Sequence, residues 1–360
     1  MRRIDLPPVE PPRAVALVLM SALGDTVRGL PLVASIRAAW PETELTWVVQ
    51  PGPHQLLDGH PAVSEFLPFQ RGRGMKAYAD FRRRVRDREF DLVLDCQRAM
   101  KAGIVTRLLR APVRLGYDRG RSFDHNWRFN NHHLPPGPPR HLQEELFEFL
   151  DRIGVPVVQR WEIPLTAEEI AARDRWFAEL DGPVLTVVLR SSRLEKDWIL
   201  SRYARVLDMA RHDLGLRPVL AGGDSAEERA DAERLKTMTD AVVRDALGGS
   251  VRQLVQLLSG SALVLSPDTG PLHIAAALGT PTIGLFGATD PRYYGPYGPF
   301  EDLVIDRYGD PERAVPDRRI RSGRMKMITE DDVCAVLERA ARIYVTGAAP
   351  RGQHPTLEER

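Results

Sequence analysis

Short runs of uninterrupted apolar residues, each followed by a segment of helical character, recur along this chain. AVALVLM at 14–20 is the first of them, and VLTVVLR at 184–190 opens a second series of the same kind. A run that is apolar at consecutive positions suits a parallel strand covered by helices on both faces, because both rows of its side chains are then buried. The alternation predicts an α/β protein built on parallel sheets.

The two series divide the sequence into two halves. The strands expected in the first half are AVALVLM (14–20), LTWVVQ (45–50), FDLVLDC (90–96) and VRLGYD (113–118). Those expected in the second half are VLTVVLR (184–190), RPVLAGG (217–223), LVLSPDTG (263–270) and PTIGLFG (281–287). The pattern restarts near 162–169, and 360 residues are enough for two domains of roughly 100–200 residues each. We therefore expect domains at 1–165 and 166–360, with ligand sites at the carboxyl ends of their strands.

Composition and the start of the sequence point to a globular protein of the cytoplasm. Hydrophobic residues make up 43% and charged residues 28% of the chain, and no apolar run approaches the ~18 residues of a membrane span. The start, MRRIDLPPVEPPR, lacks the apolar core of a signal peptide. Cys96 and Cys334 are too few for a disulfide framework or a zinc site. Four histidines without ordered ligand spacing are expected to be surface residues, not metal ligands: His125, His132, His133 and His141.

The formal charge of +1 conceals an uneven distribution. Residues 71–128 hold 16 Lys and Arg against 7 Asp and Glu, a local excess of +9, which leaves −8 for the rest of the chain. The densest part is FRRRVRDREF, which contains Arg82, Arg83 and Arg84. Two interpretations stay open: a solvated helix face, or a surface that meets an anionic partner such as phosphorylated lipid or nucleic acid.

The segment LSPDTGPLHIAAALG is the most informative one for chemistry. A strand is expected to end at Ser266, and Asp268, Thr269 and Gly270 then form a turn. Pro271 follows, where the first turn of a helix accepts proline. Such a turn brings unpaired backbone N–H groups and the positive end of a helix dipole to one place, which suits phosphate binding without a metal. A helix capped by its own Asp or Thr is the alternative, and the two are compatible.

Two other loops follow expected strands of the second half. RSSRLEKDW places Ser191, Ser192 and Lys196 where hydroxyls can donate to phosphate oxygens and an ammonium can neutralise them, although such a loop can also be merely a connection. AGGDSAEERA has glycines that permit close approach of a ligand, and Glu227 or Glu228 could accept from ribose hydroxyls. Both glutamates equally suit an ordinary first helical turn.

In the first half, SALGDTVRGLP places Asp25 on the turn after the first strand. Its carboxylate can cap the helix expected from Thr26 to Trp40, or it can act as a general base. The chain has no G-x-G-x-x-G after the first strand and no G-x-x-x-x-G-K-[ST], so dinucleotide oxidoreductase and P-loop interpretations lose their main support.

Together these segments resemble glycosyltransferase family 9, the ADP-heptose:lipopolysaccharide heptosyltransferases. The resemblance covers about 15–345 and is carried by LGDTVRGLPLVASIRAAWPETELTWVVQP, RSSRLEKDW, GGDSAEERA and SPDTGPLHIAAALGTPTIGLFGATDPRYYGPYG, in that order. It implies a GT-B fold of two Rossmann-like domains, with the acceptor on the N-terminal domain and the nucleotide sugar on the C-terminal one. The implied reaction is the inverting, metal-independent transfer of heptose from ADP-heptose to the lipopolysaccharide inner core, with no cofactor.

The resemblance also implies roles for single residues. Asp25 would be the general base, and Lys196 would be catalytic by holding the diphosphate leaving group. The residues implied for nucleotide-sugar binding are Ser191, Ser192, Lys196, Glu227 (or Glu228), Asp268, Thr269, Gly270, Pro271 and His273. The arginines at 82–84 are expected to meet the acceptor, at the inner face of the inner membrane, and no nucleic acid partner is expected.

Two alternatives to this function remain. One is a GT-B transferase that uses another nucleotide sugar or a protein acceptor, because the base pocket is not legible in the sequence. The other is a non-catalytic relative that binds anionic lipid through residues 71–128.

Overall fold

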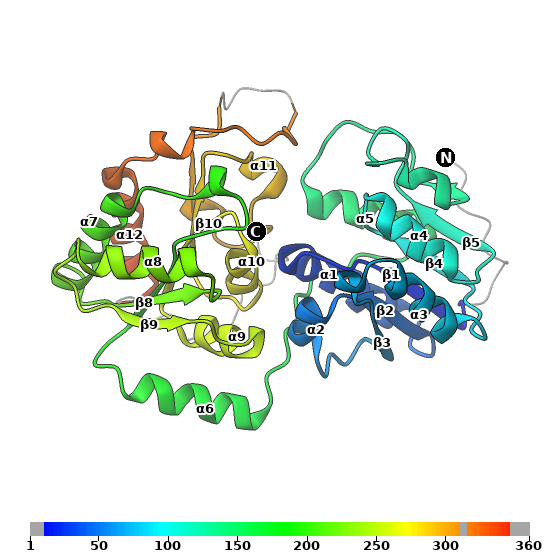
Figure 1. The fold of residues 1–360 in the computed structure, drawn as a ribbon, viewed down its shortest axis with the longest axis horizontal. Helices are drawn as coiled ribbons and strands as arrows, with labels where there is room; N and C mark the ends of the chain where they lie inside the picture. The colour runs from blue at the N-terminus through cyan, green and yellow to red at the C-terminus, as the bar shows by residue number, and fades with distance from the viewer. Residues whose placement is uncertain (1–10, 310–314, 346–360) are drawn as a thin grey trace. The chain divides into compact units, whose positions relative to one another are not determined.

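The chain folds into two compact units, Met1–Pro164 and Leu165–Arg360. The computed structural model describes residues 11–309 and 315–345, so the proline-rich start of the sequence lies largely outside it. Each unit consists of a parallel sheet with helices on both faces (Figure 1). The acceptor and donor roles expected for the two halves stay predictions.

Unit 1 contains a six-stranded parallel sheet in the order β3-β2-β1-β4-β5-β6. Its strands are β1 (Ala14–Val18), β2 (Glu44–Val49), β3 (Glu65–Pro68), β4 (Leu92–Asp95), β5 (Val113–Gly116) and β6 (His132–His133). Val18 pairs with Val48 on one side and with Asp95 on the other, so β1 lies in the middle of the sheet. Its residues from 15 to 18 are fully buried, as the apolar run predicts.

Helices cover both faces of this sheet. They are α1 (Leu23–Ala39), α2 (Pro51–Leu57), α3 (Met75–Val85), α4 (Met100–Leu108) and α5 (Leu142–Ile153), with single turns η1 (Arg71–Arg73) and η2 (Asn126–Phe129). α1 packs against α5, whereas α3 packs against α4. The α3–α4 side is closed by one apolar cluster, in which Phe81 and Val105 meet Val93 of the sheet.

Unit 2 repeats the arrangement with the strand order β12-β11-β10-β7-β8-β9. Its strands are β7 (Val184–Val188), β8 (Arg217–Gly222), β9 (Arg244–Leu247), β10 (Leu263–Pro267), β11 (Thr282–Phe286) and β12 (Val304–Asp306). Its helices are α6 (Ala167–Ala178), α7 (Leu200–His212), α8 (Ala226–Lys236), α9 (Val251–Gly260), α10 (Gly270–Ala277), α11 (Pro291–Tyr294) and α12 (Glu330–Tyr344), with turns η3 (Leu194–Lys196), η4 (Glu301–Leu303) and η5 (Met325–Met327).

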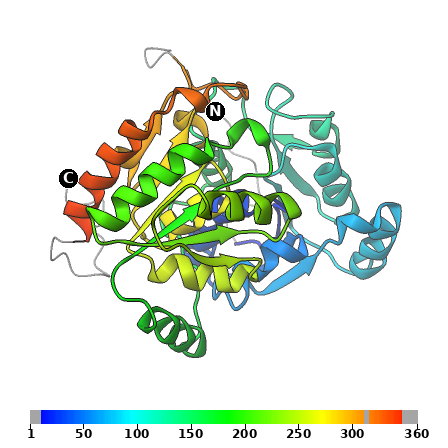
Figure 2. The same ribbon diagram turned by 60° about the vertical axis from the view of Figure 1, so that its left-hand side comes forward.

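The helices of unit 2 also form two layers. α7 packs against α8 and α12, and α9 packs against α6 and α10 (Figure 2). The first layer covers the larger apolar cluster, which includes Tyr203, Leu207, Leu220 and Leu337. The second covers a smaller one around Val188, Val219 and Leu257.

The two sheets share one topology. In each, the chain adds two strands to one side of the first strand and then crosses to the other side, so the order reverses between β1 and β4 and again between β7 and β10. Doubly wound sheets bind ligands at this reversal point, beyond the carboxyl ends of the strands. The topology therefore selects two places where function is expected, one in each unit.

One boundary expected from the sequence is wrong in a way that matters for function. α1 begins at Leu23, three residues before the expected start at Thr26, so Asp25 lies in the first turn of the helix and not in the turn before it. The reason is local: the Asp25 carboxylate accepts a hydrogen bond from the backbone N–H of Ala22 at 3.2 Å, which satisfies a donor that the helix start leaves unpaired.

Candidate functional site

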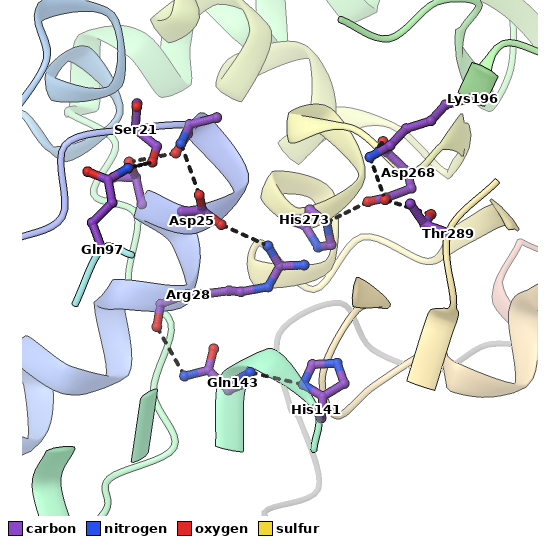
Figure 3. Close-up of polar contacts among 12 residues, drawn as sticks. Ser21, Asp25, Arg28, Gln97, His141, Gln143, Lys196, Asp268, His273 and Thr289 are labelled. Carbon is purple, nitrogen blue, oxygen red and sulfur yellow. Dashed lines mark hydrogen bonds and ion pairs between the residues drawn. The ribbon is translucent and has the colours of Figure 1, made fainter. Parts of the chain in front are cut away.

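In unit 2, three side chains converge on one buried carboxylate, that of Asp268, at the reversal point. Asp268 follows β10 directly, and its Oδ2 accepts from Lys196 Nζ at 2.7 Å and from Thr289 Oγ1 at 2.8 Å (Figure 3). Its Oδ1 lies 3.3 Å from Nε2 of His273, which is in the first turn of α10. Lys196 Nζ also donates to the Asp268 carbonyl at 3.1 Å. Loops after β7, β10 and β11 thus meet at one group.

The charge of Asp268 is secured by these partners. Burial by itself would raise the pKa of its carboxyl, but the hydrogen bond from His273 and the charge of Lys196 outweigh that effect and hold the pKa well below its usual range. The side chains of Asp268 and Lys196 are only 6% and 17% exposed, so their attraction is weakly screened. Asp268 therefore anchors a lysine in a fixed position at the end of the sheet.

The N-terminus of α10 opens directly beside this pair. Thr269 is the N-cap residue, and Gly270 and Pro271 begin the helix. In the described part of the chain the Thr269 side chain makes no capping hydrogen bond, and the carboxylate of Asp268 is engaged with Lys196 and its other partners. The self-capped alternative is thus not what the structure contains. The positive end of the helix and an ammonium group lie together, an arrangement that suits a phosphate or diphosphate.

The serine loop before Lys196 is ordered by its own contacts. The backbone N–H of Ser191 donates to Asp197 Oδ1 at 2.8 Å, and its hydroxyl donates to the Arg193 carbonyl at 2.7 Å. Ser192 is exposed. The Ser191 side chain therefore shapes the loop that carries Lys196, whereas Ser192 presents its hydroxyl to solvent.

The two glutamates at the start of α8 differ in their surroundings. Glu228 completes a capping box with Ser225, and its Oε1 accepts from the backbone N–H of Gly223 at 2.8 Å. A Cβ on Gly223 would lie 2.7 Å from Glu228 Oε2, so the glycine permits this contact. Glu227 is exposed, and its charge contributes to raising the pKa of Arg190. The capping interpretation holds for Glu228, and Glu227 is the one with an exposed carboxylate.

In unit 1, Asp25 lies at the reversal point next to the end of β1. Besides capping its own helix, it forms an ion pair with Arg28, whose NH1 is 3.4 Å from Asp25 Oδ1. The side chain of Asp25 is 40% exposed while that of Arg28 is 8% exposed. The carboxylate has two oxygens and about four acceptor sites, so capping leaves it able to accept a proton from a bound hydroxyl.

Three residues of these sites escaped the sequence analysis: Gln97, Arg28 and Thr289. Gln97 binds the loop before α1 from the β4 side, with Oε1 accepting from the Met20 N–H at 3.1 Å (Figure 3). Arg28 and Thr289 lie in segments already noted for the resemblance, LGDTVRG and GATDP, but nothing in their spacing reveals which carboxylate each one contacts.

The basic region of unit 1 is divided between the carboxyl ends and the amino ends of the strands. η1 follows β3, so Arg71 lies near the carboxyl ends of the strands. Burial, and after it the charge of Arg71, lower the pKa of Lys101 in the first turn of α4. The arginines at 82–84 are exposed on the last turn of α3, and the chain runs from there to the start of β4, at the amino ends of the strands. The structure does not bring them together with Asp25.

Two of the histidines that were expected not to bind a metal make local contacts. His133 Nε2 contacts the Trp127 carbonyl at 2.8 Å, and His141 caps α5. Within 11–309 and 315–345, no cluster of three or more His, Cys, Asp and Glu side chains is arranged to hold a metal ion. No helix in these ranges combines the length and the apolar character that crossing a membrane requires.

Solved structures resemble this fold over nearly the whole chain. A family 9 glycosyltransferase from Veillonella parvula superposes with a TM-score of 0.80 at 18% identity, covering 92% of this chain and 97% of its own. The Escherichia coli heptosyltransferase WaaC with ADP superposes with a TM-score of 0.70 at 25% identity, covering 91% and 99%. The α/β fold of two Rossmann-like units expected from the sequence is confirmed as GT-B.

Sequence comparison agrees with the fold. The Haemophilus influenzae lipopolysaccharide core heptosyltransferase OpsX is 29% identical over 297 residues, 82% of this chain and 85% of the relative. Lipopolysaccharide heptosyltransferase 1 of Escherichia coli K12 is 28% identical over 303 residues, 79% of this chain and 91% of the relative. The family profile described as glycosyltransferase family 9 (heptosyltransferase) matches residues 78–318. The resemblance carried by the loops after β1, β7, β8 and β10 is thus confirmed, and the chain belongs to glycosyltransferase family 9, the heptosyltransferases.

Proposed function

We propose that this enzyme transfers heptose from ADP-heptose to the Kdo or heptose of the lipopolysaccharide inner core, with inversion and without a metal. The observation that carries the donor half of the proposal is the Lys196–Asp268 pair at the N-terminus of α10. The relative OpsX is a lipopolysaccharide core heptosyltransferase, and WaaC is known in complex with ADP.

The pair suits a departing nucleoside diphosphate. As the glycosidic bond to ADP breaks, negative charge builds up on the diphosphate, and a fixed positive site lowers the energy of that state. An ammonium group has three N–H donors, so a phosphate oxygen can join the Asp268 carbonyl and carboxylate as a partner of Lys196. The N–H groups at the start of α10 add the helix dipole, and Thr269 adds a hydroxyl.

Asp25 supplies the base in this proposal. An inverting displacement needs a carboxylate that takes the proton of the attacking hydroxyl while the leaving group departs from the opposite face of the sugar. The Asp25 carboxylate is partly exposed at the reversal point of unit 1, and Arg28 and the Ala22 N–H hold it in place.

The acceptor half rests on the basic character of unit 1. Arg71 and Lys101 offer two cations near the carboxyl ends of the strands, which suits the carboxylate of Kdo or a phosphate of lipid A. The arginines at 82–84, exposed at the other end of α3, suit peripheral contact with an anionic membrane surface, at the cytoplasmic side where the donor would be available.

The direct experiment incubates the purified protein with ADP-heptose and Kdo-lipid A and follows the lipid by mass spectrometry and the release of ADP. We expect a lipid heavier by one heptose in the wild type, strongly slowed product formation with Asp25→Asn, and unchanged ADP binding in that variant. A wild type that binds ADP but forms no product with Kdo or heptose acceptors would contradict the proposed acceptor.

The alternatives give different outcomes in the same set of measurements. Tighter binding of UDP or GDP than of ADP would indicate another nucleotide sugar. Binding to anionic vesicles that persists in Asp25→Asn, with no turnover of any nucleotide sugar by the wild type, would indicate a lipid-binding relative without catalysis.

A further inference from the structure

The loop between β1 and α1, which leads into Asp25, is held by a side-chain amide from the neighbouring strand. Gln97 accepts from the Met20 N–H through Oε1 at 3.1 Å and donates through Nε2 to the Ser21 carbonyl. The backbone hydrogen bonds between the parallel strands β1 and β4 end with the one from the Cys96 N–H to the Val18 carbonyl. Beyond this point the side-chain amide of Gln97 makes the contacts to the loop. One side chain thus binds two successive residues of the loop.

Gln97 is itself fixed by a buried polar network. The side chain of Asn126, which is 1% exposed, donates through Nδ2 to the carbonyls of Gln97 and Ala99, each at 3.0 Å. Asn130 donates to Asn126 Oδ1 and to Asp95 Oδ2, both at 3.1 Å. A chain of hydrogen bonds therefore runs from the segment after β5 to the loop after β4. The network thus fixes the backbone from which the Gln97 side chain reaches the loop.

The other side of the loop is held differently. The backbone N–H of Gln50, at the end of β2, donates to the Met20 carbonyl at 2.9 Å. Its side-chain Nε2 is 3.5 Å from Ser21 Oγ, at the limit of a hydrogen bond. The hold from β2 is thus made by the backbone and survives a change of side chain, whereas the hold from β4 depends on the side chain.

From this asymmetry we infer that Gln97 is a positioning residue for the transfer reaction: its amide sets the place of the Ser21–Asp25 segment and, through it, of the Asp25 carboxylate. The inference rests on the proposed function, because it takes Asp25 to be the base. Gln97 acts through the backbone of Met20 and Ser21, because the Ala22 N–H that Asp25 accepts from belongs to the same peptide group as the Ser21 carbonyl that Gln97 binds.

The test compares Gln97→Met with Gln50→Met. Methionine has nearly the length of glutamine and makes neither hydrogen bond. We expect Gln97→Met to lower kcat by about 10- to 100-fold, since a misplacement of about 1 Å costs rates of that order, and to change KM for the donor and Kd for ADP less than twofold. Gln50→Met keeps its backbone contact, so its kcat should stay within about twofold of the wild type. Gln97→Glu keeps the acceptor oxygen but turns a second oxygen towards the Ser21 carbonyl, and it should behave like Gln97→Met.

A double-mutant cycle separates positioning from general damage to the fold. In an Asp25→Asn background there is no base left to position, so single-turnover rates should fall less than about threefold when Gln97→Met is added. An equal loss in both backgrounds, or a normal kcat for both Gln97 variants, would overturn the inference. Its failure is distinguishable from failure of the proposed function, because the latter shows as undiminished turnover in Asp25→Asn alone. If Gln97→Met does not fold, as judged by thermal unfolding, Gln97→Glu carries the same cycle.

Discussion

The substitution Lys196→Met separates two roles of one ammonium group: its ion pair with Asp268 in the fold, and the binding of the leaving group proposed above. Nζ lies 2.7 Å from Asp268 Oδ2 and is the cation at the start of α10. Methionine keeps the apolar stem of the side chain and removes the charge, which leaves His273 and Thr289 as partners of the buried carboxylate. The variant should therefore lose folding stability and ADP affinity by separate amounts.

The magnitudes follow from the burial of the pair. Removing one partner of a buried ion pair costs about 3–5 kcal/mol, and because two partners of Asp268 remain we expect about 3 kcal/mol in guanidinium unfolding at neutral pH. A hydrogen bond to a charged group contributes about 1.5–3 kcal/mol, so Kd for ADP in calorimetric titrations should rise about 10- to 150-fold.

The pH dependence has a definite sign. In the wild type the pKa of Asp268 is depressed, so its stabilising contribution is present above the unfolded value of 3.8 and is lost only as the pH falls through the lower folded value. Without the lysine the pKa of the buried carboxyl rises. The stability gap between the two proteins should therefore be widest at neutral pH and should narrow in acid, where the variant takes up the proton first.

Lys236→Met is the matched control, because Lys236 pairs with Glu233 at 2.7 Å and with Asp245 at 3.4 Å on the surface of unit 2. It should change the free energy of unfolding by less than about 1 kcal/mol and leave ADP binding unchanged. A folded Lys196→Met protein that binds ADP within twofold of the wild type would refute the assignment of the leaving-group site.

Four further outcomes are expected. Asp25→Asn should lower kcat about 10²- to 10⁴-fold in an assay of ADP release, with Kd for ADP unchanged in calorimetry. Glu228→Gln should cost about 1 kcal/mol in urea unfolding because it weakens the cap of α8, whereas Glu227→Gln should leave stability alone and weaken ADP binding up to about tenfold. Burial raises the pKa of Asp95 from 3.8 to about 7, so between these values the folded protein keeps a proton that the unfolded chain releases. The free energy of unfolding of the wild type should therefore fall between about pH 5 and about pH 7. Urea unfolding of Asp95→Asn at these two pH values should show no such fall. Arg83→Glu should weaken sedimentation with vesicles rich in anionic lipid at low salt and leave Kd for ADP unchanged.

The central strands could be predicted from the sequence, because burial on both faces of a sheet requires a continuous run of apolar residues. β1, β7, β10 and β11 each lie between two neighbours, and their described residues are almost entirely buried. The strands that escaped notice carry a weaker signal. β6 has two residues and ends its sheet, and β9 (RDAL) is at an edge with no fully buried residue. An edge strand covered on fewer sides needs no such run, so its composition does not mark it.

The residues of the candidate site could be predicted only in part, for a different reason. Asp25, Lys196 and Asp268 are charged and lie in the segments that follow the carboxyl ends of strands, so their positions relative to the strands indicate chemistry. Gln97 and Thr289 act by contacts across 77 and 21 residues, with Met20 and Asp268 respectively. No spacing rule connects such pairs, because their distance in the fold is set by which strands become neighbours. Hence a sequence names the groups that do chemistry more readily than the groups that hold them in place.

The distribution of charge shows how local this chemistry is. Residues 1–164 carry 24 Lys and Arg against 19 Asp and Glu, and residues 165–360 carry 26 against 30. The half proposed to bind an anionic nucleotide sugar is thus the one with net negative charge. At physiological ionic strength a charge acts over about 8 Å, so the sum over the unit has little influence on a phosphate at the end of the sheet. At the proposed site the phosphate would contact Lys196, held by Asp268, and the start of α10. Net charge is informative where a partner is as extended as a membrane, and for a diphosphate the placement of one lysine decides.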